Sequence, residues 1–342
     1  MHTPELNTLD TESIRALVAC AVLAPSSHNT QPWRFQITAD SVSLFADRTR
    51  ALRVNDAQDR ELTISCGCAL MNLRIAAAHN GLSTAYAVTP DPGDDDLLAV
   101  VSLKKAAGTP LHEAGLFSAI EGRRTYRKPF ESRDVPNALL TALADTAAEE
   151  GAWLHLFSSE EERRAVAALV ADGDAIQWAD PRWRRELAGW MRPRRRGDGL
   201  GVPDIIAPII RTAVRSFDMG KSVGAKDEKL AETAPVLAVL GTANDGVKDW
   251  MNAGQALEKI LLKAQAAGLQ ASFLNQPVEV ASLRPKLRRL LGRTGFPQIL
   301  FRLGFPSEQI PAAPRRRPDE VIDKQAGDAT GSAGSKKPPG AS

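Results

Sequence analysis

The chain has 342 residues, of which 43% are hydrophobic and 25% charged, and its formal net charge is +2. It is long enough for two packed units, and its small net charge excludes a global field that would attract nucleic acid. The polar N-terminus lacks the basic start and apolar run of a secretory signal, and no apolar run is long enough to cross a bilayer. The sequence therefore predicts a cytoplasmic protein with neither a membrane nor a nucleic-acid partner.

The first half of the chain predicts a helix, a hairpin, a long helix and two closing strands. The helices are expected over 11–23 and 57–80, and the strands over 33–37, 41–47, 83–88 and 97–103.

The second half predicts mainly helices, with strands near its end. Helices are expected from near 113 and over 136–150, 160–178, 181–191, 254–267 and 280–291, and strands over 235–243, 271–275 and 298–305. The Gly, Pro and charged residues of 192–204 predict a loop. From 324 to 342 the chain cannot bury apolar surface, and we expect a disordered tail.

An internal repeat links the two halves. Residues 67–86 and 254–273 align without gaps, and a glycine is expected to end the helix in each copy, Gly81 in the first and Gly268 in the second. Identical residues recur at positions 67/254, 69/256, 70/257, 77/264, 81/268 and 82/269. Both copies continue into strand-like sequence and then into an apolar β-rich run. A duplicated α+β unit therefore explains this match better than chance does.

Two polar motifs occur once each, in different halves. The segment APSSHNTQPWRF at 24–35 follows the first helix of the first half, and RRTYR at 123–127 follows the first helix of the second half. Three arginines and a hydroxyl suit a phosphate and a polar ring edge, whereas small hydroxyl residues and an Asn suit a planar heterocycle. Two half-motifs on two copies of one fold indicate a single composite site between them.

Each motif also has a plainer interpretation. The arginines can be a solvated charge run, and the Ser-Ser-His stretch can be a turn with local caps. A Ser/His hydrolase is disfavoured because Ser27 and His28 are adjacent and no G-x-S-x-G elbow exists. The Cys66-Gly-Cys68 pair has no second Cys or His pair at metal-binding spacing, so we expect buried thiols and no metal.

The segments APSSHNTQPWRF, RRTYRKPF, AGLQASFLNQP and PRRRPDEVI together resemble the nitroreductase-like flavin proteins. The resemblance is greatest to the Acg-type members, in which two such domains are fused in one chain, and it covers about 10 to 322. Ordinary members are homodimers that bind FMN at the subunit interface. The resemblance implies that this chain is its own pseudo-dimer, with halves at 1–112 and 113–323 and with further dimerisation left open.

The resemblance also implies roles for individual residues. It places four residues around the phosphate, ribityl chain and pyrimidine edge of FMN: Arg123, Arg124, Thr125 and Arg127. It places four others along the flavin ring: Pro25, Ser26, Ser27 and Asn29. Beside flavin N5 it places Leu274, Asn275 and Gln276, and around the phosphate also Arg315 and Arg316. Lys229 matches either a lysine near the flavin N1–C2=O edge or an ordinary surface lysine.

The function implied is an FMN-dependent oxidoreductase that takes a hydride from NADH or NADPH and reduces nitro compounds, quinones or similar small acceptors. The flavin carries the chemistry, so no catalytic side chain is expected. Trp183, Leu187, Trp190 and Met191 form an apolar stripe, which is either a covering helix or part of a lid within an insertion at 177–226. A lidded flavin-storage protein is the alternative function, and a nucleic-acid-binding protein that uses the basic runs is a third.

Overall fold

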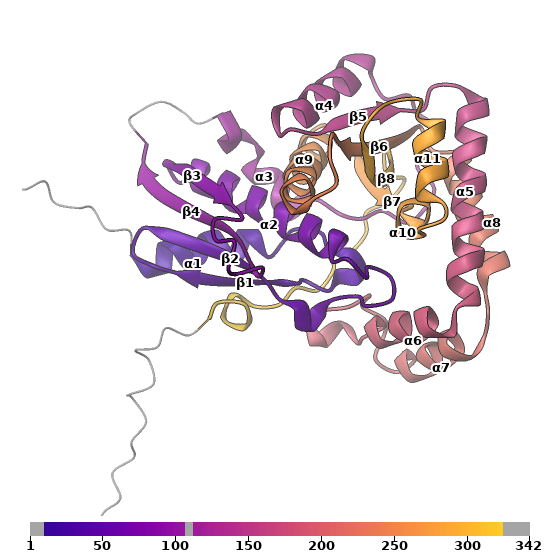
Figure 1. Cartoon of the computed structure of the whole chain (residues 1–342), viewed down its shortest axis with the longest axis horizontal. Coiled ribbons are helices and arrows are strands. Elements are labelled where there is room, and N and C mark those ends of the chain that lie inside the picture. The colour runs from indigo at the N-terminus through magenta and orange to yellow at the C-terminus, as the bar shows by residue number, and fades with distance from the viewer. Residues whose placement is uncertain (1–9, 107–111, 324–342) are drawn as a thin grey trace, which may run out of the picture.

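The structure is a computed structural model, and it describes residues 10–106 and 112–323 (Figure 1). Its described strands form two four-stranded antiparallel sheets, in the orders β1-β2-β4-β3 and β5-β6-β8-β7. The first sheet consists of β1 (Trp33–Ile37), β2 (Ser41–Ala46), β3 (Leu82–Val88) and β4 (Leu97–Lys105). The second consists of β5 (Trp153–Leu156), β6 (Val236–Thr242), β7 (Gln270–Phe273) and β8 (Phe296–Gly304).

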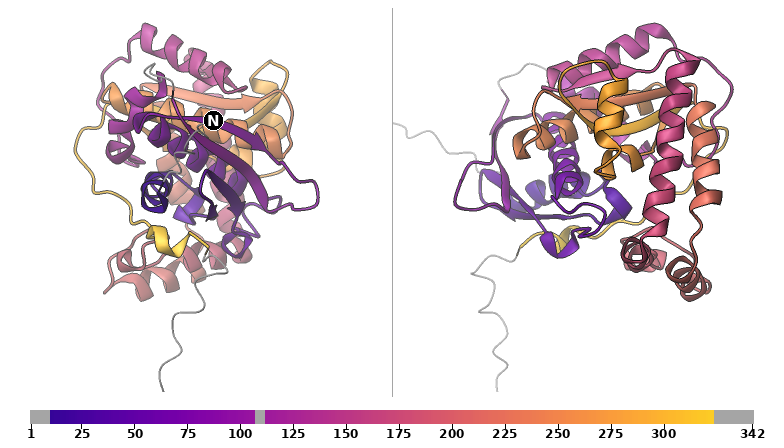
Figure 2. Two further views of the ribbon diagram at one scale, coloured as in Figure 1. Left: turned by 90° about the vertical axis from the view of Figure 1, so that its left-hand side faces the viewer. Right: turned by 45° about the vertical axis from the view of Figure 1, so that its right-hand side comes forward.

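Helices lie between the sheets and over the outer face of the second sheet (Figure 1, Figure 2). They are α1 (Thr11–Ala21), α2 (Arg60–His79), α3 (Phe117–Gly122), α4 (Asn137–Glu149), α5 (Glu160–Ala179), α6 (Pro181–Trp190), α7 (Ala207–Ser216), α8 (Gly220–Glu232), α9 (Val247–Ala266), α10 (Gln276–Glu279) and α11 (Arg284–Leu290). None of the helices in the described part of the chain is long and apolar enough to cross a membrane.

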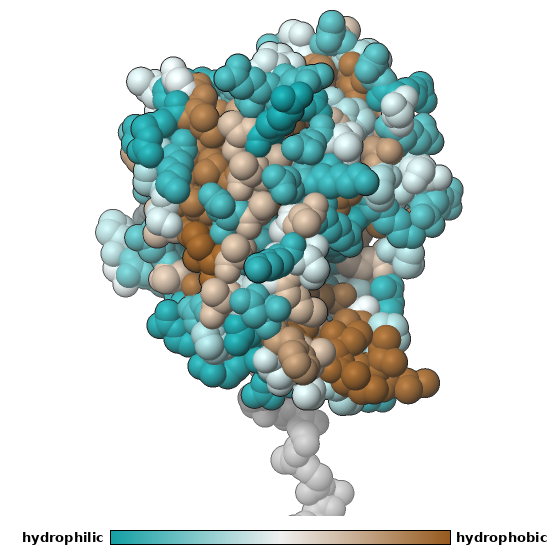
Figure 3. Space-filling model, turned by 90° about the vertical axis from the view of Figure 1, so that its right-hand side faces the viewer, coloured by the Kyte–Doolittle hydropathy of each residue, from teal (hydrophilic) through white to brown (hydrophobic). Residues whose placement is uncertain are grey.

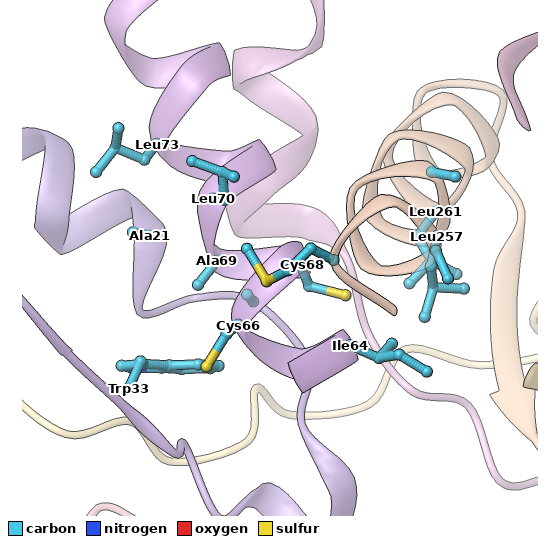
Figure 4. Packing of buried hydrophobic residues seen from close by; sticks show 14 of the residues in the cluster. Ala21, Trp33, Ile64, Cys66, Cys68, Ala69, Leu70, Leu73, Leu257 and Leu261 are labelled. Carbon is cyan, nitrogen blue, oxygen red and sulfur yellow. The ribbon is translucent and has the colours of Figure 1, made fainter. Parts of the chain in front are cut away.

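The centre of the molecule is the crossing of α2 and α9. Helix α2 is buried on almost every side, because one face packs on the first sheet and another on α9. In Figure 4, Cys66 points toward Trp33, whereas Leu257 and Leu261 approach α2 from α9. Gly67 and Gly254 allow the two backbones to approach closely, since a Cβ on either would overlap the backbone of the other helix.

The second sheet separates two cores. Along β6, Val236, Ala238 and Leu240 pack into the central core, whereas Leu237 and Val239 pack under α5 on the other face. This is the two-residue alternation of a strand that is buried on both faces. As a result, the second half is thicker than the first, and the α5–α8 insertion stands on its outer side (Figure 2).

Most elements expected from the sequence are present, and the α+β class is confirmed. Gly81 and Gly268 both adopt positive φ, +70° and +81°, directly after the two repeat helices, as predicted for their caps. The sequence did not predict β5, α7, α8 or α10, and α11 is shorter than the helix expected over 280–291. The expected tail at 324–342 lies outside the described residues.

Candidate functional site

A cavity of about 770 Å³ receives side chains from both sequence motifs. Of the fourteen residues expected around a flavin, eleven line this cavity: Pro25, Ser26, Ser27, Asn29, Arg123, Arg124, Thr125, Arg127, Asn275, Gln276 and Arg315. Leu274, Lys229 and Arg316 do not line it. The two half-motifs, about a hundred residues apart in sequence, therefore meet at one place.

Arginines from two segments, RRTYR and the C-terminal arm at 306–323, converge at one part of the cavity. Arg123 and Arg315 both donate to the carbonyl oxygen of Leu23, at 2.9 and 3.0 Å. Burial, together with the like charges of Arg123 and Arg124, lowers the pKa of Arg315 to about 9. Glu258 faces this group, 3.3 Å from Nε of Arg123, and its own pKa is raised by burial. A second carboxyl group, Glu121, also lines the cavity and attracts Arg124. Three guanidinium groups therefore face two carboxyl groups, which leaves the cluster with an excess of positive charge.

The RRTYR segment is held in an extended form against the second sheet. The Tyr126 amide donates to the Ala271 carbonyl oxygen at 2.7 Å, and Thr125 forms a parallel bridge with Ala271. The buried Tyr126 ring anchors the segment, and its hydroxyl pairs with Ser307 at 2.8 Å. This anchoring fixes the direction in which the neighbouring arginines enter the cavity.

The loop after α1 has an unusual backbone. His28, Asn29 and Gln31 have φ values of 51°, 54° and 52°, a region that residues other than glycine rarely adopt. Side-chain and backbone contacts hold the loop in this conformation. For example, the backbone N–H of Gln31 donates to Oγ of Ser26 at 3.0 Å. Such conformations cluster at functional sites, because the surrounding structure must compensate their cost.

This loop also joins two distant segments. Nδ2 of Asn29 donates to the carbonyl oxygens of Gly199 and Pro314, each at 3.0 Å. Nε2 of Gln31 donates to the Gly197 carbonyl oxygen at 2.8 Å. Oε1 of Gln31 accepts a hydrogen bond from the backbone N–H of Arg316 at 2.8 Å. We call these four contacts the clamp. It ties the loop between α6 and α7, and the C-terminal arm at 306–323, to the first half.

The segment after β7 supplies amide groups at another part of the cavity. Oδ1 of Asn275 accepts the Leu300 amide at 3.1 Å, which fixes its orientation. Nε2 of Gln276 donates to the carboxylates of Asp174 and Asp227 at 3.2 Å. The buried Oε1 of Gln276 has no hydrogen-bond partner among the described residues. Leu274, by contrast, points into the core under α5.

Several carboxyl groups line the same cavity, and the sequence analysis did not identify them. Glu61 on α2 accepts the Ser27 hydroxyl at 2.5 Å, and burial and the nearby Glu279 raise the pKa of Glu61 to about 8. Burial and Asp227 raise the pKa of Asp174 to about 7. His28 shifts the other way, since burial and Arg127 lower its pKa to about 4. Glu61 and His28 are therefore largely neutral near pH 7, whereas Asp174 is about half protonated there.

Part of the α5–α8 insertion covers the cavity. Trp178, Trp183 and Leu187 line it, and they pack in a cluster of their own with Ala188 and Val214. The loop that follows α6 contributes Arg194, which also donates to the Ala312 carbonyl oxygen at 2.6 Å. Arg195, in the same loop, lies outside the cavity and pairs at 3.3 Å with Asp204.

Two expected residues lie elsewhere. Lys229 is an exposed side chain in the last turn of α8, outside the cavity, so the structure favours the surface-lysine interpretation. The resemblance matched this lysine because it precedes the strand β6, but α8 presents it to solvent. Arg316 donates to the carbonyl oxygens of Gln31 and Glu320, and so it secures the C-terminal arm, outside the cavity.

Comparisons with known proteins identify the family of the chain. The family model described as "Nitroreductase family" matches residues 120–305. The chain is 32% identical over 326 residues, 92% of each chain, to "Putative NAD(P)H nitroreductase Rv3131" of Mycobacterium tuberculosis (strain ATCC 25618 / H37Rv). The chain belongs to the nitroreductase family. It is therefore a member of a family of oxidoreductases.

Two further proteins are similar to this chain. A second M. tuberculosis protein of that strain, "Putative NAD(P)H nitroreductase acg", is 28% identical over 93% of this chain and 97% of its own length. Among solved structures, the "FMN and NADPH-dependent nitroreductase NfnB from sphigopyxis sp. strain HMH" is 20% identical. It covers 61% of this chain and 98% of its own, with a TM-score of 0.42.

Proposed function

We propose that the 770 Å³ cavity binds FMN and that the chain reduces small acceptors with electrons from NADH or NADPH. The observation that carries the proposal is the arginine cluster of Arg123, Arg124 and Arg315, whose positive charge exceeds the negative charge of the two facing carboxyl groups, Glu121 and Glu258. A phosphate dianion would offset this excess, and Nε of Arg315 has no hydrogen-bond partner among the described residues. The residues present thus fit the phosphate of FMN.

Other groups fit the rest of the cofactor. Hydroxyl and amide side chains of Ser26, Ser27 and Asn275 line the cavity beyond the arginines, and the unpartnered Oε1 of Gln276 offers an acceptor. Bound FMN would supply hydride transfer, while the protein holds it and excludes water. The apolar side chains Trp183 and Leu187 line the cavity and suit contact with small planar acceptors such as nitroaromatic compounds and quinones.

We also propose that the chain is a tandem duplication that acts as an intramolecular pseudo-dimer, with halves at 1–112 and 113–323. Both sheets have the same strand order, and both have a register irregularity in the second strand, at 44/45 and at 240/241. The short turn at 38–40, which joins β1 to β2, corresponds in the second half to the long insertion at 157–235, which joins β5 to β6. The arm at 321–323 crosses back and pairs with Phe35 on β1, as an exchanged segment would in a dimer.

The correspondence between the two halves predicts one flavin site per chain. The loop 22–32 between α1 and β1 lines the cavity, whereas its counterpart between α4 and β5 has only residues 150–152. The second half therefore lacks the segment that would complete a symmetric second site. The proposed lid comprises residues 177–226, of which α6 and Arg194 line the cavity.

Anaerobic mixing of the purified flavoprotein with NADPH, and separately with NADH, tests the activity. Loss of the visible flavin band within seconds, and its return when a quinone or nitroaromatic compound is added, is the expected result. A band that persists through prolonged incubation with both donors would contradict the reductase and favour the storage protein. An absence of flavin after reconstitution with excess FMN would contradict both.

A further inference from the structure

Helix α7 and the residues at its ends expose large apolar side chains. Ile205 is 91% exposed, Ile209 70%, Phe217 64% and Ile206 42%. Figure 3, which faces the right-hand side of Figure 1, shows apolar surface gathered on one projecting part of the molecule. Contiguous exposed apolar surface of this kind marks an interaction site more often than isolated apolar residues do.

The folded chain uses only part of the apolar face of α7. Val214 and the half-buried Ile210 pack on α6, next to Trp183 and Leu187. On a helical projection, Ile206 and Ile209 extend this apolar face beyond the part that α6 covers, while Arg211 and Arg215 lie on the polar side. No residue of α7 lines the cavity, so these isoleucines have no role in covering the cofactor site.

Charge is unevenly distributed around this helix. Residues 192–221 carry seven arginines and lysines against three aspartates, which is a net charge of +4, whereas the whole chain has +2. The rest of the chain therefore has a net charge of −2. Arg194, Arg195, Arg196, Arg211, Arg215 and Lys221 are all exposed. Exposed cations beside an apolar helix face complement an anionic lipid surface, where the cations meet headgroups and the apolar side chains enter the acyl boundary.

We propose that α7 docks on an anionic membrane surface. The apolar set, Ile205, Ile206, Ile209 and Phe217, would enter the interfacial layer, and the neighbouring arginines would contact lipid phosphates. This differs from the sequence-based expectation of no membrane partner, because the exposed isoleucines could be identified only in the folded chain. Docking would place α6, the proposed cover of the cavity, beside the lipid.

A lipid surface fits this region better than a second copy of the chain. Helices α6 and α7 project from one end of the molecule, away from both sheets (Figure 1, Figure 2). A convex projection buries little area against another folded protein, and stable interfaces need about 800 Å² from each partner. The excess of like charge would also oppose the approach of two identical surfaces.

Co-sedimentation with vesicles tests the proposal on the full-length protein. We expect binding to mixed phosphatidylcholine and phosphatidylglycerol vesicles, weakening as salt rises, and little binding to phosphatidylcholine alone. The double variant Ile205→Asp, Ile209→Asp should bind at least about tenfold more weakly, because two apolar anchors are replaced by charges. Leu290→Asp on α11 is the control, since Leu290 is also exposed, at 42%, but lies on another helix.

Three results would contradict docking of α7 on a membrane. Wild-type protein that stays in the supernatant with anionic vesicles would overturn the proposal, as would an Ile205/Ile209 double variant that binds like the Leu290 control. A wild-type dimer in gel filtration that the double variant converts to monomer would also overturn it, because the occupant of α7 would then be a second copy. Circular dichroism of both variants establishes that they are folded.

Discussion

Gly67 and Gly254 meet at the crossing of α2 and α9, and their relationship is reciprocal. A Cβ on Gly67 would overlap the Met251 carbonyl oxygen and the Gly254 Cα, and a Cβ on Gly254 would overlap the Ile64 carbonyl oxygen and the Gly67 Cα. Met251 and Ile64 each stand three residues before the glycine of their own helix. Mutual contact of matched positions is the property of a twofold interface, which supports the proposed pseudo-dimer.

Substitution of either glycine by alanine should destabilise the fold. Because the added methyl group meets backbone atoms and not a flexible side chain, we expect Gly67→Ala or Gly254→Ala to lower the free energy of unfolding by about 2–4 kcal/mol. Urea denaturation measures this change. Gly189→Ala on α6 is the control, since nothing lies within 4 Å of its added Cβ. Equal stability of all three variants would contradict the close crossing.

The arginine cluster predicts a selective loss of cofactor affinity. Arg124→Ala should raise the Kd for FMN by roughly ten- to a hundredfold, since a charge-assisted hydrogen bond contributes about 1.5–3 kcal/mol. Arg123→Ala should do the same, but it also removes the cation that faces the buried Glu258 and so destabilises the fold. Fluorescence titration of FMN measures affinity. Arg195→Ala and Lys229→Ala should bind FMN like wild type, and a loss confined to Arg195→Ala would move the phosphate site to the basic loop.

The clamp predicts that Asn29 controls retention of the cofactor. Asn29→Gly removes the side-chain hydrogen bonds to Gly199 and Pro314 and also the one that Oδ1 accepts from Arg315 at 3.1 Å, while glycine adopts the φ of 54° without strain. We expect FMN to dissociate faster and the loop at 191–203 to become more sensitive to protease. Stopped-flow dissociation and limited proteolysis measure the two effects. Asn80→Gly, at the end of α2 and outside the cavity, is the control, and equal dissociation rates in the two variants would refute a role for the clamp.

Glu61 predicts a pH dependence of stability. Its pKa in the folded protein is about 8, above the ordinary value of 4.5, so folding favours the protonated form. The stabilising contribution of this proton is complete below pH 4.5 and is lost as the pH rises toward and through 8. Glu61→Gln should therefore show a smaller fall in Tm between pH 5 and pH 8 than wild type does. The exposed Glu161→Gln variant should retain the full fall, and identical pH profiles for all three proteins would refute the shift.

Local sequence patterns predicted much of the fold. Gly81 and Gly268 predicted where α2 and α9 end, and apolar β-rich runs predicted β4 and β8. Strand β5 was missed because its residues are all half-buried and show no alternation. Helix α7 was missed because Ile205 and Ile209 are exposed, so its apolar pattern does not follow burial in the core.

The site was predictable where a motif carries it. Arg123 and Asn29 belong to recognisable segments, and both line the cavity. The role of Glu61 was not predictable, since only its tertiary neighbours remove it from water and raise its pKa. The contact of Asn29 with Gly199 joins residues 170 positions apart, and no local pattern specifies it.

The flavin content of a single chain tests the central claim most directly. Native mass spectrometry of the purified, FMN-saturated protein, diluted until it is monomeric, counts cofactor and chain in the same ion. Because the loop at 22–32 has only a three-residue counterpart at 150–152, the account predicts one FMN bound to one chain. Two tightly bound FMN per chain, or loss of FMN in step with dissociation of an oligomer, would contradict a single composite site formed within the chain.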